Sequence, residues 1–480
     1  MNLVAKLGSR LLLLVCGRIG LLVLGLMATA LLTRILGPAG FGSYRAAVAY
    51  LGLVVVLADL GLGSIFVRQI SRAGADQSRI IGNALALRLS IAFTLFLIAV
   101  LLAHILPFDA TERLGIFCGA AGFVAYSAHL MLFGLFQQKL RQQGAIVAEI
   151  GGGLILLGAI YLLARLGADP AYFVAALGGS YIVTFLVSLA FALRLVPFRL
   201  RFERAEWLKL ARPALSLAGA GTLMVIYVRA DTVLLAFFKT PEAVGLYGVP
   251  VKISDSLLGI ALLFIGLVAP LMAKAARREQ ARFREILNGS LKAAFIGSIA
   301  VALGFAALAD EIVWLLAGSS FAEGADILRL LTAFFVLHMT TLLLREACVA
   351  LDIQGQLLPV YLVGAVVALL AYALFIPPFA GLGAAAALIL AECCVFCGVL
   401  LILRRALRPP HAVKVPLVAI LCGLLSAALM WALQTSGWGW FATTTAVLSA
   451  YFVLLFLSGA LTLSMLQAVI AFATAKRNGT

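Results

Sequence analysis

The sequence predicts an all-α membrane protein that crosses the bilayer many times. Of its 480 residues, 64% are hydrophobic and only 12% are charged, and the mean hydropathy is +1.14. Soluble domains contain about 45–50% apolar and about 25% charged residues. Surface-to-volume scaling leaves a water-soluble fold too much exposed area to hide this many apolar side chains. Two soluble domains, which the length alone would suggest, are therefore excluded.

The apolar runs set the number of membrane spans. A helix needs roughly 20 apolar residues to cross the hydrocarbon core, so about fourteen helices account for the apolar fraction. Several runs exceed this length, which indicates tilted helices or helices that project into water. The expected helices cover residues 11–36, 42–70, 80–106, 114–137, 144–166, 171–193, 213–238, 243–272, 291–318, 325–351, 357–379, 381–403, 416–435 and 440–470.

The basic residues indicate the orientation of these helices. Alternate loops carry 25 Lys and Arg residues on one side and six on the other, and cytoplasmic loops are the ones that collect Lys and Arg. The sequence therefore predicts a multi-pass membrane protein with both termini in the cytoplasm. The net charge of +16 does not indicate a nucleic-acid partner, because the basic residues punctuate apolar runs instead of forming a patch on a polar face.

A short repeat predicts the domain organisation. Pro38–Tyr44 and Pro241–Tyr247 share the pattern Pro-x-x-x-Gly-x-Tyr, and each lies between the first two helices of a six-helix block. Six helices separate the copies, so the blocks are expected to be parallel repeats related by an axis along the membrane normal. The expected domains are an N-terminal lobe at 1–194, a basic amphipathic cytoplasmic linker at 195–212, a C-terminal lobe at 213–403, and two additional helices with a cytoplasmic tail at 404–480.

Ionisable residues inside the spans are the candidates for a functional site. A charge near the bilayer centre costs at least about 2.5–3.5 kcal/mol on insertion scales, so these residues should line a polar cavity or pair with one another. The alternative is that residues near a helix end reach water with their long side chains, or form salt bridges that hold the lobes together. The bases are Arg18, Arg88, Arg229, Lys252 and Arg345, and the acids are Asp59, Glu149, Asp231, Asp255, Glu346 and Glu392.

Two positions carry separate arguments. Asp59 follows a long uninterrupted helical stretch and has a short side chain, so it should face a cavity or pair with a base. Lys252 and Asp255 are three residues apart on one helix, where side chains at this spacing are neighbours. Mutual neutralisation is therefore an alternative to a substrate-binding role for Lys252.

Several motifs resemble those of a transporter family. They are Leu36–Tyr44, Leu57–Gly63 with the sequence Leu-Ala-Asp-Leu-Gly-Leu-Gly, Val228–Asp231, and Pro378–Ala385. They resemble the polysaccharide biosynthesis export proteins, the Wzx-type flippases of the multidrug/oligosaccharidyl-lipid/polysaccharide exporter superfamily, over most of residues 10–405. The resemblance implies two six-helix lobes around a central cationic cavity. It also implies that an undecaprenyl-diphosphate-linked oligosaccharide is moved to the outer leaflet by alternating access, for O-antigen, capsule or exopolysaccharide assembly.

On this resemblance the buried bases are candidates for binding the diphosphate. Arg offers fixed donors that match phosphate geometry, and Lys offers a mobile point charge. The candidate substrate-binding residues are Arg18, Arg88, Arg229, Lys252 and Arg345. The candidates for counter-ions, or for sites that couple transport to protons or sodium ions, are Asp59, Asp231 and Asp255. We expect no catalytic residue, metal or other cofactor.

Three other functions stay open. A lipid II flippase or a cation-coupled multidrug exporter belongs to the same superfamily, although a drug exporter should prefer acidic cavity residues. A membrane glycosyltransferase or polymerase should carry a sizeable external loop, and the longest outer loops here, 108–113 and 318–324, are short. We therefore expect a transporter and not an enzyme, with the lipid-linked oligosaccharide and the bilayer as partners and a polymerase and glycosyltransferases as further ones.

Overall fold

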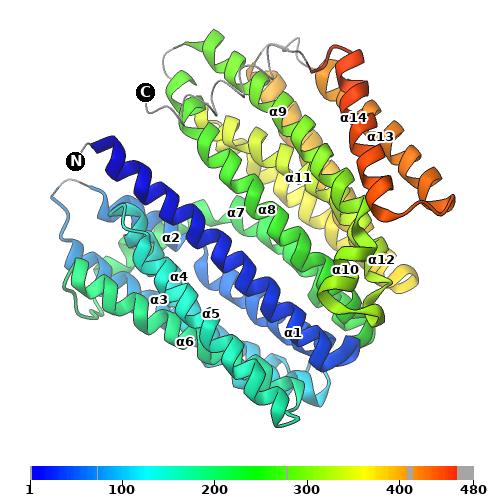
Figure 1. Cartoon of the computed structure of the whole chain (residues 1–480). Helices are drawn as coiled ribbons and strands as arrows, with labels where there is room; N and C mark the ends of the chain where they lie inside the picture. Colours follow the sequence, from blue (N-terminus) through cyan, green and yellow to red (C-terminus); the bar gives the residue numbers. More distant parts are fainter. Residues whose placement is uncertain (1–2, 73, 277–278, 408–413, 462–480) are drawn as a thin grey trace. The chain divides into compact units, whose positions relative to one another are not determined.

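Helices make up all the regular structure in the part of the chain that the structure describes. This computed structural model covers residues 3–72, 74–276, 279–407 and 414–461. Within these ranges eleven helices are long and apolar enough to cross a membrane. The chain is therefore a multi-pass, all-α membrane protein (Figure 1), as its sequence predicts. The exact number of spans stays a prediction.

The chain forms two compact units. Unit 1 comprises Met1–Lys252, Leu316–Phe321 and Tyr361–Ala391, and unit 2 comprises Ile253–Leu315, Ala322–Val360 and Glu392–Thr480. Two long helices, α8 (Pro241–Ala276) and α12 (Leu357–Ala406), contribute to both units. The expected lobes at 1–194 and 213–403 stay a prediction.

Polar caps and small residues shape the helices of unit 1. The Asp109 carboxylate accepts a hydrogen bond from the Glu112 backbone in a capping box, which satisfies otherwise unpaired N–H groups at a helix start. A Cβ on Gly122 would lie only 2.1 Å from the Gly178 Cα, so glycines let α4 and α6 pack backbone to backbone. The helices are α1 (Leu3–Asp59), α2 (Leu62–Ile70), α3 (Gln77–Leu102), α4 (Ala110–Gln138), α5 (Gln143–Arg165), α6 (Pro170–Leu195) and α7 (Arg204–Phe238).

Two long helices bend where the sequence predicts a loop between spans. Helix α1 bends at Gly37, whose φ of 65° is left-handed, immediately before Pro38. Helix α12 bends at Ala380, with a φ of 47°, after a pair of prolines. A proline removes a backbone donor and clashes with the preceding turn, so the predicted breaks at 36–42 and 379–381 coincide with real changes of direction.

Three of the expected helices are interrupted, divided or shortened in the structure. The expected helix 42–70 is interrupted at Leu60 and Gly61, which both have positive φ, so α2 is separate and short. The expected helix 291–318 divides at Leu308 into α9 and α10. The expected helix 440–470 ends at Leu457, because Gly459 with φ of 70° closes its last turn, a common C-terminal arrangement. Residues 462–470 of that expectation lie outside the described residues.

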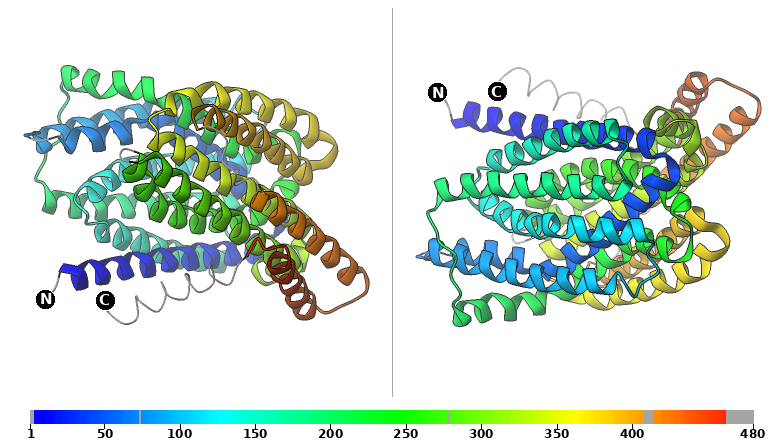
Figure 2. Two further views of the ribbon diagram at one scale, coloured as in Figure 1. Left: turned by 90° about the horizontal axis from the view of Figure 1, so that it is seen from above. Right: turned by 90° about the horizontal axis from the view of Figure 1, so that it is seen from below.

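Unit 2 contains the C-terminal helix pair. Helices α13 and α14 run side by side as a hairpin (Figure 2), and both pack on α9. The Tyr451 hydroxyl donates a hydrogen bond to the Ile296 carbonyl at 3.3 Å, within a core that includes Phe295, Ile299 and Val447. The remaining helices of this unit are α9 (Gln280–Ala307), α10 (Ala309–Ala317), α11 (Gly324–Ala350), α13 (Lys414–Thr435) and α14 (Trp440–Leu457).

Candidate functional site

A cavity inside unit 1 contains one of the predicted basic residues. It has a volume of about 430 Å³ and lies between α1, α4, α5 and α6. Three of its wall residues are glycines of α1 and α5, and side chains of other residues pack closely against them. We call it the unit-1 cavity; its polar lining residues are Arg18, Tyr126, Glu149, Ser180, Tyr181 and Thr184.

A chain of polar contacts crosses the four helices around this cavity. Arg18 Nη1 lies 3.4 Å from Glu149 Oε2, and the other carboxylate oxygen lies 3.3 Å from His129 Nε2. The second ring nitrogen of His129 is 2.8 Å from the Ser188 hydroxyl. His129 is buried, while Arg18 and Glu149 stay partly exposed. Two wall residues, Arg18 and Glu149, therefore form one connected network with the buried imidazole of His129, which does not line the cavity.

Two further predicted bases belong to the same unit. Lys252 Nζ would lie 3.3 Å from a Cβ placed on Gly25, which is itself a wall residue of the unit-1 cavity. Arg229 is exposed on α7, and its charge acts on the Tyr126 hydroxyl together with the charges of Arg18 and Glu149. The structure thus brings Arg18, Arg229 and Lys252 toward one region of unit 1.

Arg88 and Asp59 form an ion pair with each other. Arg88 is completely buried, and its Nη1 donates to Asp59 Oδ1 at 2.7 Å and to the Ala58 carbonyl at 2.8 Å. Its Nε donates to the Ser127 hydroxyl at 2.7 Å. The Asp59 side chain keeps 43% exposure. Arg88 therefore joins α3 to the end of α1 and to α4, and Asp59 meets the expectation of pairing with a base.

Asp231 is tied to the second repeat motif. Its Oδ2 accepts a hydrogen bond from the Tyr247 hydroxyl at 2.7 Å, and its Oδ1 accepts one from the Thr232 backbone at 2.6 Å. Tyr247 is the tyrosine of the second Pro-x-x-x-Gly-x-Tyr motif. Asp231 therefore links α7 to the start of α8, and its role as a counter-ion stays a prediction.

The other predicted site residues belong to unit 2. Arg345 Nη2 lies 2.8 Å from Glu346 Oε1 on the same helix, and Asp255 is half-buried on α8. A buried pair in this unit, His338 Nδ1 and Glu392 Oε2 at 3.0 Å, joins α11 to α12. The roles of Arg345 and Asp255 stay predictions.

Both histidine–carboxylate pairs were missed by the sequence analysis. His129 and His338 each stand alone among apolar neighbours, and their partners lie on other helices. Each histidine lies inside an apolar helix, where a buried polar side chain needs a hydrogen-bond partner. This requirement could have predicted that both histidines pair with a polar residue of another helix. Glu149 and Glu392 are among the ionisable residues of the expected spans, but no role is predicted for them.

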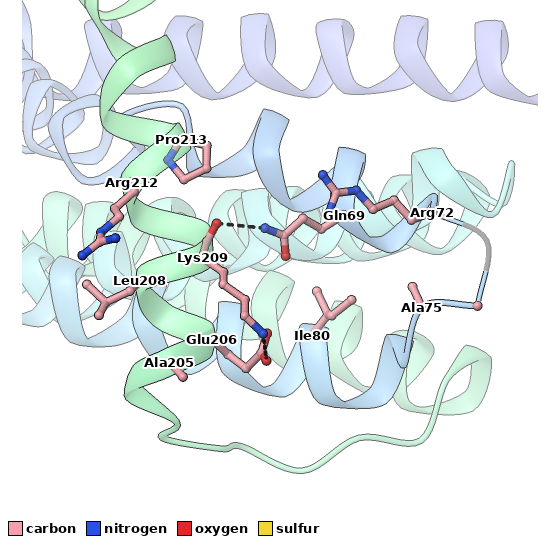
Figure 3. A pocket seen from close by; sticks show the side chains of 11 residues that line it. Gln69, Arg72, Ala75, Ile80, Ala205, Glu206, Leu208, Lys209, Arg212 and Pro213 are labelled. Carbon is pink, nitrogen blue, oxygen red and sulfur yellow. Dashed lines mark hydrogen bonds and ion pairs between the residues drawn. The ribbon is translucent and has the colours of Figure 1, made fainter.

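A second cavity of unit 1 is lined by two basic residues of the expected linker, Lys209 and Arg212. It has a volume of about 760 Å³ and lies between the α2–α3 connection and the start of α7 (Figure 3). Arg72, Lys209 and Arg212 line it, and Gln69 Nε2 donates to the Lys209 carbonyl at 3.0 Å. The end of the linker is therefore helical and continuous with α7. We call this the basic pocket.

The start of α7 is held to α3 by a partly buried ion pair. Arg79 Nε donates to Glu203 Oε2 at 2.8 Å, and the Glu203 backbone donates to Asn83 Oδ1 at 2.9 Å. The hydrogen bond from Arg79 holds the pKa of the Glu203 carboxyl below its ordinary value. In the described ranges no group of three or more His, Cys, Asp or Glu residues is placed to hold a metal.

Solved structures of transporters have the same fold. The lipid II flippase MurJ in an inward closed conformation has a TM-score of 0.71 at 13% identity, covering 92% of this chain and 98% of that one. An inward-facing multidrug resistance MATE family transporter of the MOP superfamily has a TM-score of 0.65 at 15% identity, covering 80% of this chain and 94% of that one. A MOP superfamily transporter from Pyrococcus furiosus has a TM-score of 0.55 at 16% identity, covering 81% of this chain and 95% of that one.

Sequence comparison identifies the family. The curated proteins show no significant match. The family described as "Polysaccharide biosynthesis protein" matches residues 10–276, which is more than half of the 480 residues and includes the unit-1 cavity and both repeat motifs. The chain therefore belongs to the polysaccharide biosynthesis protein family.

Proposed function

We propose that this protein is a flippase that moves an undecaprenyl-diphosphate-linked oligosaccharide from the cytoplasmic to the outer leaflet of the inner membrane, for surface polysaccharide assembly. Membership of the polysaccharide biosynthesis family supports the glycan. A fold shared with a lipid II flippase supports a lipid-linked substrate. The observation that carries the proposal is the unit-1 cavity, whose wall combines Arg18 with hydroxyl-bearing side chains inside a membrane unit.

The chemistry of the cavity suits a diphosphate linked to a sugar. Guanidinium donors match phosphate oxygens, and charge-assisted hydrogen bonds are roughly twice as strong as neutral ones. Arg18, Arg229 and Lys252 lie toward one region of unit 1, and Glu149 lies beside Arg18. Their positive charges suit an anionic ligand, while Tyr126, Ser180 and similar hydroxyls can bind sugar hydroxyls.

The lipid tail and the headgroup take different routes in this proposal. The prenyl chain stays in the bilayer, while the diphosphate and glycan pass through the polar interior. The basic pocket at the start of α7 attracts the diphosphate from the cytoplasmic leaflet. Rocking of one predicted six-helix lobe against the other then exposes the site to each side in turn, driven by a proton or sodium gradient through Asp59, Asp231 or Asp255.

A cation-coupled multidrug exporter is the second candidate, because a MATE transporter shares the fold. Its cargo would be cationic. The bases gathered in unit 1 would repel such a cargo, so this function is less well supported. A lipid II flippase would use the same diphosphate chemistry and differs only in the glycan.

Reconstitution of the full-length protein tests the proposal. Proteoliposomes would contain lipid-linked oligosaccharide extracted from the source cells, and oxidation by externally added periodate would report glycan that arrives at the outer leaflet. We expect flipping by the unaltered protein and a marked loss in R18A. R165A is the matched control, because Arg165 is exposed, lies outside the unit-1 cavity lining, and contacts Tyr161 on its own helix. Equal flipping in protein-free vesicles would overturn the proposal.

A further inference from the structure

Unit 2 has a cavity lined by aromatic rings and charged groups near the C-terminal helix pair. It has a volume of about 480 Å³ and lies where α9 and α10 meet α13 and α14. Three of the five tryptophans in the chain line it, namely Trp431, Trp438 and Trp440. All three are more than half exposed. We call this cavity the tryptophan pocket.

Charged groups form the other side of the tryptophan pocket. Arg329 forms ion pairs with Asp310 and with Asp326, the latter at 2.6 Å. Two shielded atoms of the lining, Glu311 Oε2 and Arg329 Nε, have no hydrogen-bond partner within the described part of the chain. Such atoms are costly in a folded protein unless water or a ligand completes them. The carboxylates of Asp310 and Glu311 and the guanidinium group of Arg329 therefore line the pocket beside exposed indole rings.

This combination suits a sugar better than a lipid. A pyranose ring has an apolar C–H face and a rim of hydroxyl groups. Indole rings provide large, rigid apolar faces with a polar edge. Carboxylates accept hydrogen bonds from sugar hydroxyl groups, and guanidinium groups donate hydrogen bonds to the hydroxyl oxygens. A membrane-interface belt explains exposed tryptophans, but it does not explain why Asp310, Glu311 and Arg329 lie in the same pocket.

We propose that the tryptophan pocket binds a sugar residue of the glycan that the protein transports. The proposal rests on the proposed flippase function. The excess of Lys and Arg in the other loops predicts that this end of unit 2 faces away from the cytoplasm. The pocket therefore receives the glycan after it crosses, and α13 and α14, which lie outside the expected duplication, supply most of its aromatic lining.

Binding is tested on the full-length protein in nanodiscs with one defined probe. The probe is the free oligosaccharide released by mild acid from the lipid-linked pool of the source cells. Saturation-transfer NMR should show contact with the sugar protons, and we expect a several-fold loss of transfer in W438A and E311Q. W438F keeps an aromatic face and should retain most of the signal. W314A is the matched control, because Trp314 is exposed on α10 but does not line the pocket.

The possible results separate the two proposals. No transfer from the unaltered protein, or equal transfer from W438A, overturns the tryptophan pocket as a sugar site. If the same preparation flips the lipid-linked oligosaccharide, the flippase function stands. Transfer that is lost in W438A but kept in W314A and W438F supports the pocket. Such binding without any flipping refutes the flippase function and leaves a sugar-binding membrane protein.

Discussion

Gly42 and Gly245 occupy equivalent positions in the two repeat motifs, and each motif packs against the other at these glycines. A Cβ on Gly42 would lie 1.6 Å from the Pro241 carbonyl oxygen, and a Cβ on Gly245 would lie 2.0 Å from the Pro38 carbonyl oxygen. The glycine of each motif thus makes room for the proline carbonyl of the other. The shared pattern that appears in the sequence as a repeat is, in unit 1, a reciprocal backbone contact.

The first prediction concerns this contact. G42A and G245A should each lower the thermal unfolding temperature of the purified protein, because backbone atoms, which cannot rotate away, occupy the space of the new methyl group. Overpacking of this kind typically costs about 1–3 kcal/mol. G52A is the control, since nothing lies within 4 Å of a Cβ there. Equal stability of G42A and G52A would contradict the close approach.

The second prediction concerns the Arg88–Asp59 pair. R88A leaves the Asp59 carboxylate and the Ser127 hydroxyl without their donor, and breaking a buried pair costs about 3–5 kcal/mol. The partial exposure of Asp59 reduces this cost, so we expect a loss of about 2–3 kcal/mol in unfolding free energy. D59N should cost less than R88A, because an amide still accepts a hydrogen bond from Arg88. An R88A variant as stable as the unaltered protein would exclude a joining role for Arg88.

The third prediction concerns pH and the start of α7. A carboxyl whose pKa is lowered in the folded state stabilises above its ordinary pKa, and this stabilisation is lost as pH falls through the lowered value. The contact of Glu203 with Arg79 should therefore weaken only in strong acid. At that acidic pH, the backbone amides of residues 203–212 should lose protection from hydrogen exchange. E203Q should show fast exchange already at neutral pH, and identical exchange in both proteins would argue against the contact.

The fourth prediction concerns Lys252. Removing a charge-assisted contact of about 1.5–3 kcal/mol should lower glycan appearance at the cell surface by about ten-fold or more at matched protein abundance. K252A tests this, and K252R, which keeps the charge, should restore part of the export. R165A is again the control. Unchanged export by K252A would remove Lys252 from the substrate site.

The sequence predicted some features closely and others not at all. Loop residues such as Pro38 and Pro378 located the bends of α1 and α12, because proline acts on its own helix. The end of α14 at Leu457 was misplaced by the apolar residues that follow it. The hydropathy of the sequence stays high beyond Leu457, so it predicts a longer helix. The positive φ of Gly459 is a backbone conformation that hydropathy does not predict.

The sequence alone determined that the protein is a helical membrane protein, because apolar content and the spacing of charges follow directly from composition and order. It also identified the ionisable residues that a bilayer makes costly. Only the tertiary structure decided their partners. Arg88 forms an ion pair with Asp59, and Glu149 contacts Arg18 and His129. Asp231 accepts a hydrogen bond from the Tyr247 hydroxyl. The physical reason is that an ion pair between helices depends on packing and rotation of those helices. Residues far apart in the chain become neighbours only after the bundle has formed.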